Sequence, residues 1–253
     1  MTDEQKIWCQ RGGADEGPLL LLIHGMGANA TAWNALLPFI EANWSGGWMT
    51  LDLRGHGRSA HQNTYGVGDY AGDIAQLIGS DREVSIIGHS LGGVIGYALA
   101  SGLYDLKIRS LTAIGIKTNW EDVDFARGAA VAAQPAKIFE SKGAAIERYL
   151  KVAGLFGLID LAATDHQAGI GQKDDGYSLA SDPRANKIKP LNFAALASMA
   201  QAPVQLLCGD RDPVATAEGM AGLGSMVTTI DGAGHYPQIE DPEKLWKLIH
   251  DKL

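Results

Sequence analysis

Clusters of basic residues, long apolar runs and an export signal are all missing from this sequence. Its 253 residues carry a net charge of −8 at neutral pH. Because no cluster of Lys and Arg offers phosphates a binding surface, the sequence argues against a nucleic-acid partner. No apolar run approaches the roughly 20 residues that cross a bilayer, and the N-terminal "MTDEQKIW" lacks the charged-then-apolar layout of a secretory signal. A membrane partner is therefore not expected either.

Cysteine and metal-ligand motifs are also scarce. The two cysteines, Cys9 and Cys208, lie far apart and form neither a CxxC motif nor a zinc-ligand spacing. Cys208 ends the apolar run "PVQLLCG", a position typical of a buried, unreactive thiol. The seven histidines show no HExxH or similar spacing, and the glycines of "GMGAN" lack the third glycine of a dinucleotide fingerprint. The sequence therefore predicts a cytoplasmic protein with no metal and no other cofactor.

Short apolar runs recur along the chain and alternate with helical patterns. The runs are apolar on successive residues, which is typical of strands buried on both faces of a parallel sheet. We expect strands at 18–25, 47–53, 84–90, 108–116, 203–209 and 225–232. Helical patterns follow most of them, at 31–43, 69–80, 92–103, 215–222 and 241–252. This alternation predicts an α/β fold with a doubly wound, mostly parallel sheet, to which residues 6–13 are expected to add an antiparallel edge strand.

The alternation of strands and helices stops after Ile116. From there to about Met199 no strand is expected. Alanine-rich stretches at 125–141 and 143–163 instead predict helices. A segment rich in turn residues follows at 171–190.

This change of pattern predicts a single domain with an insertion. We expect residues 1–116 and 200–253 to form the α/β core, and residues 117–199 to form a helical cap inserted after the strand at 108–116. The insertion holds ten basic and ten acidic residues, so the whole net charge of −8 lies outside it. The insertion is therefore the less acidic part of the molecule.

The most specific motif is "GHSLGG", in which Ser90 is flanked by Gly88 and Gly92. A strand that turns directly into a helix forces the residue at the apex into a strained conformation with its side chain outward. Residues two positions away then approach so closely that only small residues fit. The apex hydroxyl lies at a helix N-terminus, where free N–H groups favour developing negative charge. This G-x-S-x-G pattern indicates a nucleophile elbow.

A serine nucleophile needs two partners. Its hydroxyl is weakly nucleophilic at neutral pH, so it requires a base that a carboxylate orients. After such an elbow the expected chain order is Asp or Glu, then His. "CGDRDPV" offers Asp210 and Asp212, and "DGAGHYPQIEDP" offers His235. Both loops follow the carboxyl ends of expected strands, where open α/β sheets place their sites.

Two further motifs complete a family pattern. With "HGMG" at 24–27 and "DLRGHGRS" at 52–59, the chain resembles the α/β-hydrolase superfamily, in its branch of cap-bearing serine esterases. The resemblance covers nearly the whole chain outside the insertion. It implies the α/β-hydrolase fold for the core and a serine-dependent activity.

The resemblance also chooses between the two aspartates. In the family the acid closes a G-x-x-D pattern, which corresponds here to Gly209 and Asp212. Asp210 would then cap the turn. The implied catalytic triad consists of Ser90, Asp212 and His235.

The "HGMG" turn is expected to help bind the oxyanion of a tetrahedral intermediate. One backbone N–H would come from Leu91, the residue after the nucleophile, and by resemblance a second would come from Met26. Gly25 and Gly27 let the backbone approach closely. His24 is a candidate for anchoring this loop or, with Gly25, for contacting the substrate.

Apolar side chains of the insertion are candidates for the substrate pocket. They would either line an acyl or alkyl pocket or pack the cap onto the sheet. These residues are Trp120, Phe125, Leu155, Phe156 and Ile159, of which Trp120, Phe125 and Phe156 are the candidates for substrate contact.

For four further polar residues the sequence predicts a role less specifically. His89 precedes the nucleophile and either packs behind the elbow or touches the substrate. By the same resemblance, His56 in "RGHGRS" is expected to brace the sheet near the site. Arg127 and Arg184 are cations that either hold a substrate carboxylate or lie in solvent.

These expectations predict a cofactor-free serine hydrolase for a carboxylic ester, a thioester or a lactone. Serine at position 90 argues against haloalkane dehalogenases and epoxide hydrolases, which use a carboxylate there. Carbon–carbon bond hydrolases and lyases share the triad, although "GHYPQIEDP" lacks the tryptophan that commonly follows their histidine. A small-molecule receptor with a slow triad is the alternative from another class. The expected partner is a small ester-like molecule, and the sequence sets no oligomeric state.

Overall fold

The structure, a computed structural model, describes residues 6–163 and 165–253. A seven-stranded sheet forms the centre of this described part. Its strands are β1 (Cys9–Gly13), β2 (Leu19–Ile23), β3 (Gly47–Leu51), β4 (Glu83–His89), β5 (Lys107–Ile114), β8 (Val204–Gly209) and β9 (Val227–Ile230).

The strand order agrees with a doubly wound sheet. The order is β1-β3-β2-β4-β5-β8-β9, and neighbouring strands are parallel except for β1 and β3. The mostly parallel α/β class is therefore confirmed, and so is the antiparallel edge strand, which is β1. Because the order reverses direction between β2 and β4, the carboxyl ends of these strands form the edge where a site is expected.

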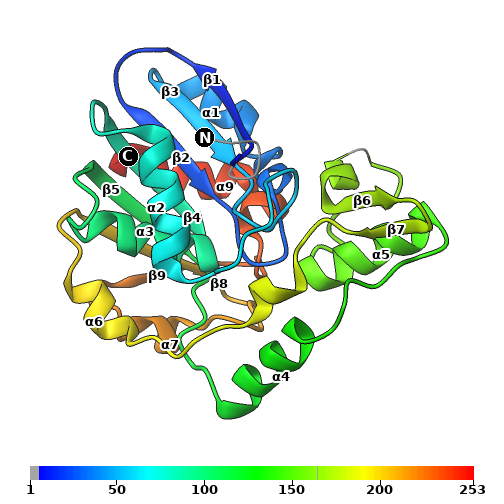
Figure 1. Ribbon diagram of the computed structural model, residues 1–253. Coiled ribbons are helices and arrows are strands. Elements are labelled where there is room, and N and C mark those ends of the chain that lie inside the picture. The colour runs from blue at the N-terminus through cyan, green and yellow to red at the C-terminus, as the bar shows by residue number, and fades with distance from the viewer. Residues whose placement is uncertain (1–5, 164) are drawn as a thin grey trace.

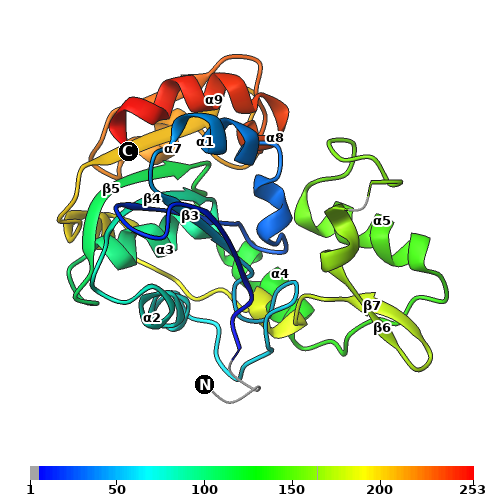
Figure 2. The same ribbon diagram turned by 90° about the horizontal axis from the view of Figure 1, so that it is seen from above.

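Helices cover both faces of the sheet (Figures 1 and 2). α2 (Val67–Ile78) and α3 (Leu91–Ala100) lie on one face, and α1 (Leu37–Asn43) and α9 (Pro242–Ile249) lie on the other. No helix in the described residues is both long and apolar enough to cross a membrane. The shorter helices of the core are η2 (Ala30–Trp33), α7 (Ala217–Ala221), α8 (Pro237–Glu240) and η5 (His250–Lys252).

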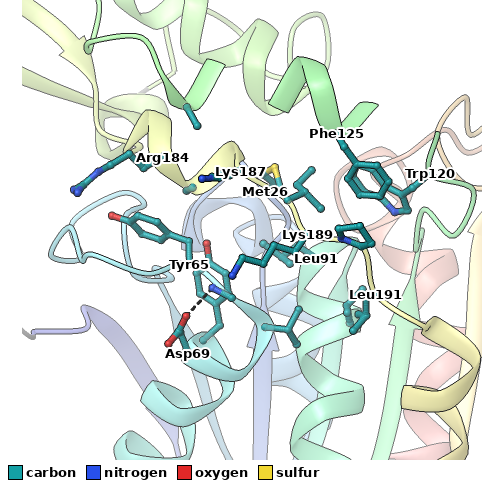
Figure 3. Close-up of a pocket in the computed structure, with 18 of the residues that line it drawn as sticks. Met26, Tyr65, Asp69, Leu91, Trp120, Phe125, Arg184, Lys187, Lys189 and Leu191 are labelled. Atoms are coloured by element: carbon teal, nitrogen blue, oxygen red, sulfur yellow. Dashed lines mark hydrogen bonds between the residues drawn. The ribbon is translucent and has the colours of Figure 1, made fainter. Parts of the chain in front are cut away.

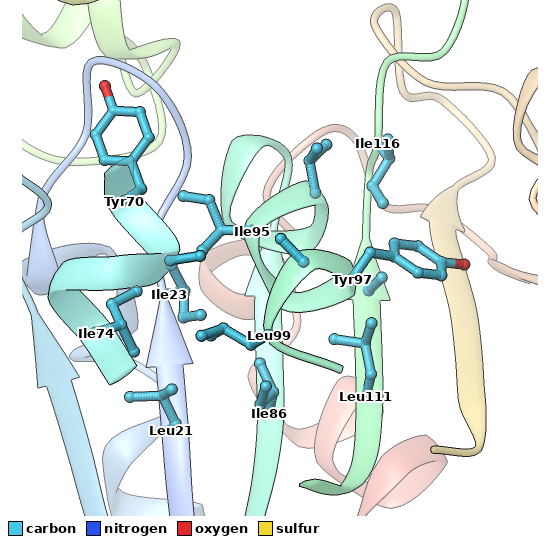
Figure 4. Packing of buried hydrophobic residues seen from close by; sticks show 14 of the residues in the cluster. Leu21, Ile23, Tyr70, Ile74, Ile86, Ile95, Tyr97, Leu99, Leu111 and Ile116 are labelled. Carbon is cyan, nitrogen blue, oxygen red and sulfur yellow. The ribbon is translucent and has the colours of Figure 1, made fainter. Parts of the chain in front are cut away.

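The central strand β2 shows why the apolar runs form this sheet. All five residues of "LLLLI" are buried. Leu21 and Ile23 join the apolar cluster beneath α2 and α3 (Figure 4), whereas Leu20 and Leu22 join the cluster on the α1 and α9 side. Because successive side chains of a strand point to opposite faces, one continuous apolar run fills both layers.

Between β5 and β8 the chain leaves the sheet. Figure 1 shows α5, β6 and β7 together beside one end of the sheet. The elements of this insertion are α4 (Asp122–Ala132), α5 (Lys142–Ala153), η3 (Asp165–Gly169), β6 (Ile170–Lys173), β7 (Gly176–Leu179), η4 (Pro183–Asn186) and α6 (Phe193–Ser198).

The insertion differs from expectation at three places. The helix expected at 125–141 is shorter, since α4 ends at Ala132. β6 and β7 form an antiparallel hairpin where no strand was expected, because two four-residue strands with mostly polar side chains carry no readable alternation. The helix expected at 143–163 is too long. α5 ends at Ala153, because Gly154 takes the left-handed conformation with φ 72° and caps the helix.

The last helix of the insertion contacts the sheet layers. Phe193, Leu196 and Ala197 of α6 pack against the apolar cluster that includes α3. The boundaries placed at 117 and 199 between core and cap remain a prediction.

Two glycines in the middle of α2 and α3 test how tightly α3 packs on the sheet. A methyl group on Gly96 would lie 2.5 Å from Cδ1 of Leu111, so Gly96→Ala should lower the free energy of unfolding by about 1–3 kcal/mol. A methyl group on Gly72 meets no atom within 4 Å, so Gly72→Ala should raise it by about 0.5–1 kcal/mol. Urea titration followed by circular dichroism measures both, and a stabilising Gly96→Ala would contradict this packing.

Candidate active site

Ser90 forms the apex of a sharp turn between β4 and α3. β4 ends at His89 and α3 begins at Leu91, so one residue separates strand from helix. The Ser90 backbone has φ 51° and ψ −114°, a conformation that residues with side chains rarely adopt. Its N–H donates to the Ile114 carbonyl at 2.7 Å, which holds the apex against the end of β5. The turn therefore carries the backbone strain that is common at functional sites.

The flanking glycines allow this turn. A Cβ on Gly88 would collide with the backbone of Gly92, and a Cβ on Gly92 would collide with the Ile23 carbonyl of β2. Only residues without a side chain fit such approaches. As the first residue of α3, Leu91 has a backbone N–H without an acceptor in its own helix.

Asp212 and His235 form a hydrogen-bonded pair. His235 Nδ1 donates to Asp212 Oδ2 at 2.8 Å. The other carboxylate oxygen, Oδ1, accepts from the N–H groups of Val214 at 2.7 Å and Ala215 at 3.0 Å. The Asp212 side chain has no exposed surface. These bonds fix the carboxylate, place the proton of His235 on Nδ1 and leave Nε2 able to accept a proton. Asp210 instead accepts from the Gly232 N–H at 2.8 Å.

Three contacts hold the loop that carries His235. Glu240 accepts from the N–H groups of Gly234 at 2.7 Å and Tyr236 at 2.8 Å, one on each side of the histidine. His89 Nε2 donates to the His235 carbonyl at 2.8 Å. The loop is therefore fixed by hydrogen bonds although it contains no regular structure.

Two contacts bring the chain segments of Ser90 and His235 together. The ring of His89 lies 4.6 Å from the ring of His235 between centroids. A Cβ on Gly115 would lie 3.2 Å from the His235 ring and 3.3 Å from Asp212 Oδ2, so the end of β5 passes beside the pair. Within the described residues, His235 makes no hydrogen bond with the Ser90 hydroxyl. Such bonds are often long without substrate and shorten when it binds.

His24 fixes the backbone of the loop that follows β2. Its Nδ1 donates to the Gly25 carbonyl at 2.7 Å, and its Nε2 accepts from the Leu53 N–H at 2.9 Å. Burial, with a further contribution from His56, lowers the pKa of His24 to about 3. The expectation that the His24 side chain contacts substrate is wrong, because it is fully buried and both nitrogens are used. Gly25 lies against the elbow, since a Cβ there would be 3.2 Å from Ser90 Cβ.

His56 and His89 are also buried. The rings of His24 and His56 contact edge to face at 5.4 Å, and burial lowers the pKa of His56. Burial and the neighbouring His235 lower the pKa of His89 well below its ordinary value. His89 therefore stays neutral behind the elbow, and the alternative of substrate contact is wrong.

A cavity of about 1140 Å³ opens above Ser90. Figure 3 shows Met26 and Leu91 on the core side and Trp120 and Phe125 on the insertion side. The rings of Trp120 and Phe125 stack at 5.9 Å between centroids. The structure therefore places these two aromatic residues, Met26 and Leu91 together with Ser90 in one cavity.

Other candidates from the insertion lie elsewhere. Phe156 is 51% exposed and does not line this cavity, so substrate contact by Phe156 is a wrong expectation. Leu155 and Ile159 pack instead in an apolar cluster with α5. Arg127 is exposed on α4. Arg184 lines the cavity, but its guanidinium pairs with Asp182 at 2.6 Å.

Helix α5 is tied to both loops of the site. Tyr236 donates its hydroxyl to the Ala153 carbonyl at the end of α5, and burial raises the pKa of Tyr236. Asn29, in the loop after Met26, donates to the Tyr149 hydroxyl at 2.8 Å. The insertion thereby supports the histidine loop and the first loop from one side.

A family model describes this architecture. The model of the alpha/beta hydrolase family matches residues 20–248. The chain belongs to the alpha/beta hydrolase family. The match includes the elbow, the acid loop and the histidine loop, so hydrolase chemistry is supported at the family level. Among the described residues, no group of three or more His, Cys, Asp or Glu side chains could hold a metal ion.

Two similar proteins carry names that describe different activities. A 2-(acetamidomethylene)succinate hydrolase of Mesorhizobium japonicum is 29% identical over 260 residues, which cover 92% of this chain and 87% of that protein. The magnesium-chelatase 30 kDa subunit of Rhodobacter capsulatus is 35% identical, but only over 37% of this chain and 34% of that protein.

Solved structures share the fold over nearly the whole chain. An E-2-(acetamidomethylene)succinate hydrolase has a TM-score of 0.78 at 26% identity, covering 99% of this chain and 96% of that one. A thioesterase domain from the curacin biosynthetic pathway has a TM-score of 0.79 at 20% identity, covering 96% and 94%. The second likeness shows the fold alone.

Sequence reasoning missed several residues that support the site. Glu240 follows His235 by five positions, but nothing in the sequence says that its carboxylate returns to cap the loop. Tyr236 and Tyr149 read as ordinary core aromatics. Gly115 carries a signal that could have been used, because a glycine directly after a strand indicates close approach of another segment.

The buried, neutral His24 makes stability depend on pH. Its pKa is about 3 in the folded protein and near 6.5 when unfolded, so protons bind preferentially to the unfolded chain below pH 6.5. The free energy of unfolding reaches its full value above pH 6.5. As the pH falls from 6.5 to 5, protonation of His24 in the unfolded chain should lower this free energy by about 2 kcal/mol. Urea titrations should show a weaker pH dependence in His24→Asn than in wild type. An unchanged slope in His24→Asn would contradict a neutral His24.

Proposed function

We propose that this protein is a serine hydrolase that cleaves a carboxylic ester through an acyl-enzyme, with thioesters or lactones as related substrates. The observation that carries the proposal is the Asp212–His235 hydrogen bond of 2.8 Å beside the strained Ser90. This bond orients the imidazole so that Nε2 can take the serine proton. Met26 and Leu91 line the same cavity as Ser90, which supports their role at the oxyanion.

Acylation uses each of these groups once. His235 Nε2 takes the Ser90 proton while Oγ attacks the acyl carbon, and the carbonyl electron pair moves onto oxygen. The backbone N–H groups of Met26 and Leu91 stabilise this oxyanion. Asp212 stabilises the imidazolium and keeps its own charge. When the intermediate collapses, the bond to the alcohol breaks and the imidazolium protonates the leaving alcohol.

Deacylation repeats these steps with water. His235 Nε2 takes a proton from water, whose oxygen attacks the acyl carbon of the Ser90 ester. The same N–H groups hold the second oxyanion. Its collapse breaks the acyl–Oγ bond, returns the proton to Ser90 and releases the acid. Neither acylation nor deacylation in this scheme requires a cofactor.

A second candidate is hydrolysis of another bond, including a carbon–carbon bond. The observation that favours it is the relative that covers 92% of this chain, whose name describes a hydrolase of 2-(acetamidomethylene)succinate. The same serine, histidine and acid would serve that reaction, so the residues of the site do not separate the two candidates. Substrate tests do.

The proposed partner is a small ester-like molecule, and the proposed setting is the cytoplasm. The free thiols of Cys9 and Cys208 are compatible with that setting, because reducing compartments keep cysteines unpaired.

The two aspartates of the acid loop provide a matched test. With 4-nitrophenyl esters from acetate to octanoate, wild type should show repeated turnover. Asp212→Asn should lower kcat by roughly 10²- to 10⁴-fold, since the imidazole loses its orientation, and Ser90→Ala should reduce turnover to background. Asp210→Asn should stay within about twofold of wild type, because an asparagine Oδ1 can still accept the hydrogen bond from the Gly232 N–H.

The outcomes separate the candidate functions. Wild type as inactive as Ser90→Ala on every ester would contradict ester hydrolysis. A single slow turnover per protein molecule would favour the receptor over the enzyme. Equal losses in Asp210→Asn and Asp212→Asn would contradict the assignment of Asp212 as the acid.

A further inference from the structure

The cavity above Ser90 is basic, although the chain as a whole is acidic. Four of its described lining residues are cationic, and a single one, Asp69, is acidic. The chain itself has a net charge of −8. The cationic lining residues are Lys117, Arg184, Lys187 and Lys189.

Two of these cations already have carboxylate partners. Lys117 Nζ pairs with Asp124 at 2.7 Å, and Arg184 pairs with the buried Asp182 at 2.6 Å. Asp182 is held ionised: burial alone would raise its pKa, but hydrogen bonds from Arg184 and Tyr65 outweigh this and lower it. These two cations serve the structure of the cavity wall.

The single carboxylate among the described lining residues, Asp69, also has partners. Asp69 accepts from the Gly66 N–H at 2.7 Å and lies 3.7 Å from Arg54. It therefore caps α2, and Arg54 lies beside its negative charge.

Lys187 and Lys189 differ from the other cations. Within the described residues, neither ammonium has a carboxylate within 4.0 Å, and both side chains are exposed. Figure 3 shows Lys187 next to Arg184, and Lys189 farther along the same chain segment and nearer Leu91. Two unpaired positive charges therefore border the space that contains the nucleophile.

The segment that carries the two lysines is fixed by its neighbours. The Asp182 N–H donates to the Gly55 carbonyl at 2.8 Å, and Tyr65 donates its hydroxyl to Asp182 at 2.6 Å. Further along, the Ile188 N–H donates to the Asn186 carbonyl at 2.8 Å, and Gly128 of α4 packs directly on that carbonyl. Lys187 thus projects from a backbone that is held on both sides, and Lys189 follows directly after Ile188.

We infer that Lys187 and Lys189 bind an anionic group, a carboxylate or a phosphate, on a part of the substrate remote from the bond that is cleaved. This inference rests on the proposed function, because it places the cleaved bond at Ser90. The stretch between the two ends is apolar, since Met26, Leu91 and Leu191 line the cavity as well. The substrate class is therefore an ester or thioester with an apolar middle and an anionic end.

A matched pair of esters tests this inference. 4-Nitrophenyl hexanoate and the mono-4-nitrophenyl ester of adipate have acyl chains of equal length, but only the second ends in a carboxylate. The double variant Lys187→Met/Lys189→Met removes both charges and keeps the apolar stems. It should lose about tenfold in kcat/KM on the adipate ester, mainly through KM, and stay within about twofold on the hexanoate. Raising the salt concentration should weaken the adipate reaction of wild type selectively.

A second pair of substrates distinguishes the two anions. S-hexanoyl pantetheine is neutral, whereas S-hexanoyl phosphopantetheine carries a phosphate on the leaving thiol and no charge on the acyl chain. A loss in the double variant confined to the phosphorylated thioester assigns the lysines to a phosphate, and a loss confined to the adipate ester assigns them to a carboxylate. Lys107→Met/Lys252→Met is the control, because both lysines are exposed outside the cavity lining, and it should match wild type on all four substrates.

Equal losses on charged and neutral substrates, or no loss at all, would overturn the inference while leaving ester hydrolysis intact. If wild type hydrolyses none of these substrates, the proposed function fails. A binding measurement then tests whether Lys187 and Lys189 bind an anion. Adipate and phosphopantetheine should each be titrated against the tryptophan fluorescence of the protein, since Trp120 lines the cavity. Saturable binding that the double variant weakens supports the site, and equal binding or none contradicts it.

Discussion

The sharp turn at Ser90 is the constraint on which the rest of the site depends. A single residue separates β4 from α3, so the serine takes a strained conformation and its hydroxyl projects from the carboxyl edge of the sheet. This is possible only because Gly92 lets α3 approach the Ile23 carbonyl of β2. The same approach sets the position of the Leu91 N–H. The proposed nucleophile and one proposed oxyanion donor are thus placed by a single packing contact between helix and sheet.

The histidine loop is positioned by hydrogen bonds rather than by packing of regular elements. Asp212 orients the ring of His235, and Glu240 holds the backbone on both sides of it. His89 binds the His235 carbonyl from behind, and burial keeps this neighbour neutral, so it adds no charge beside the base. The hydrogen bond to Asp212 therefore leaves Nε2 of His235 as the proposed proton acceptor.

The core and its motifs were predictable because they leave strong local signals. The continuous apolar run of β2 indicates a strand buried on both faces, and the glycines around Ser90 indicate an elbow. The insertion left weaker signals. A polar hairpin at β6 and β7 has no hydrophobic period, and the cavity position of Trp120 rather than Phe156 depends on how the insertion packs. The burial of His24 was likewise hidden, since the sequence does not show that its partners are backbone groups.

The central claim is that Ser90 is the nucleophile and that the pair of Asp212 and His235 activates it. Labelling with a fluorophosphonate probe at neutral pH, followed by mass mapping of the modified peptide, tests it most directly. The account predicts one adduct per chain, on Ser90, that forms much more slowly in the Asp212→Asn variant. An adduct on any other residue, or equal labelling rates in the two proteins, would contradict it.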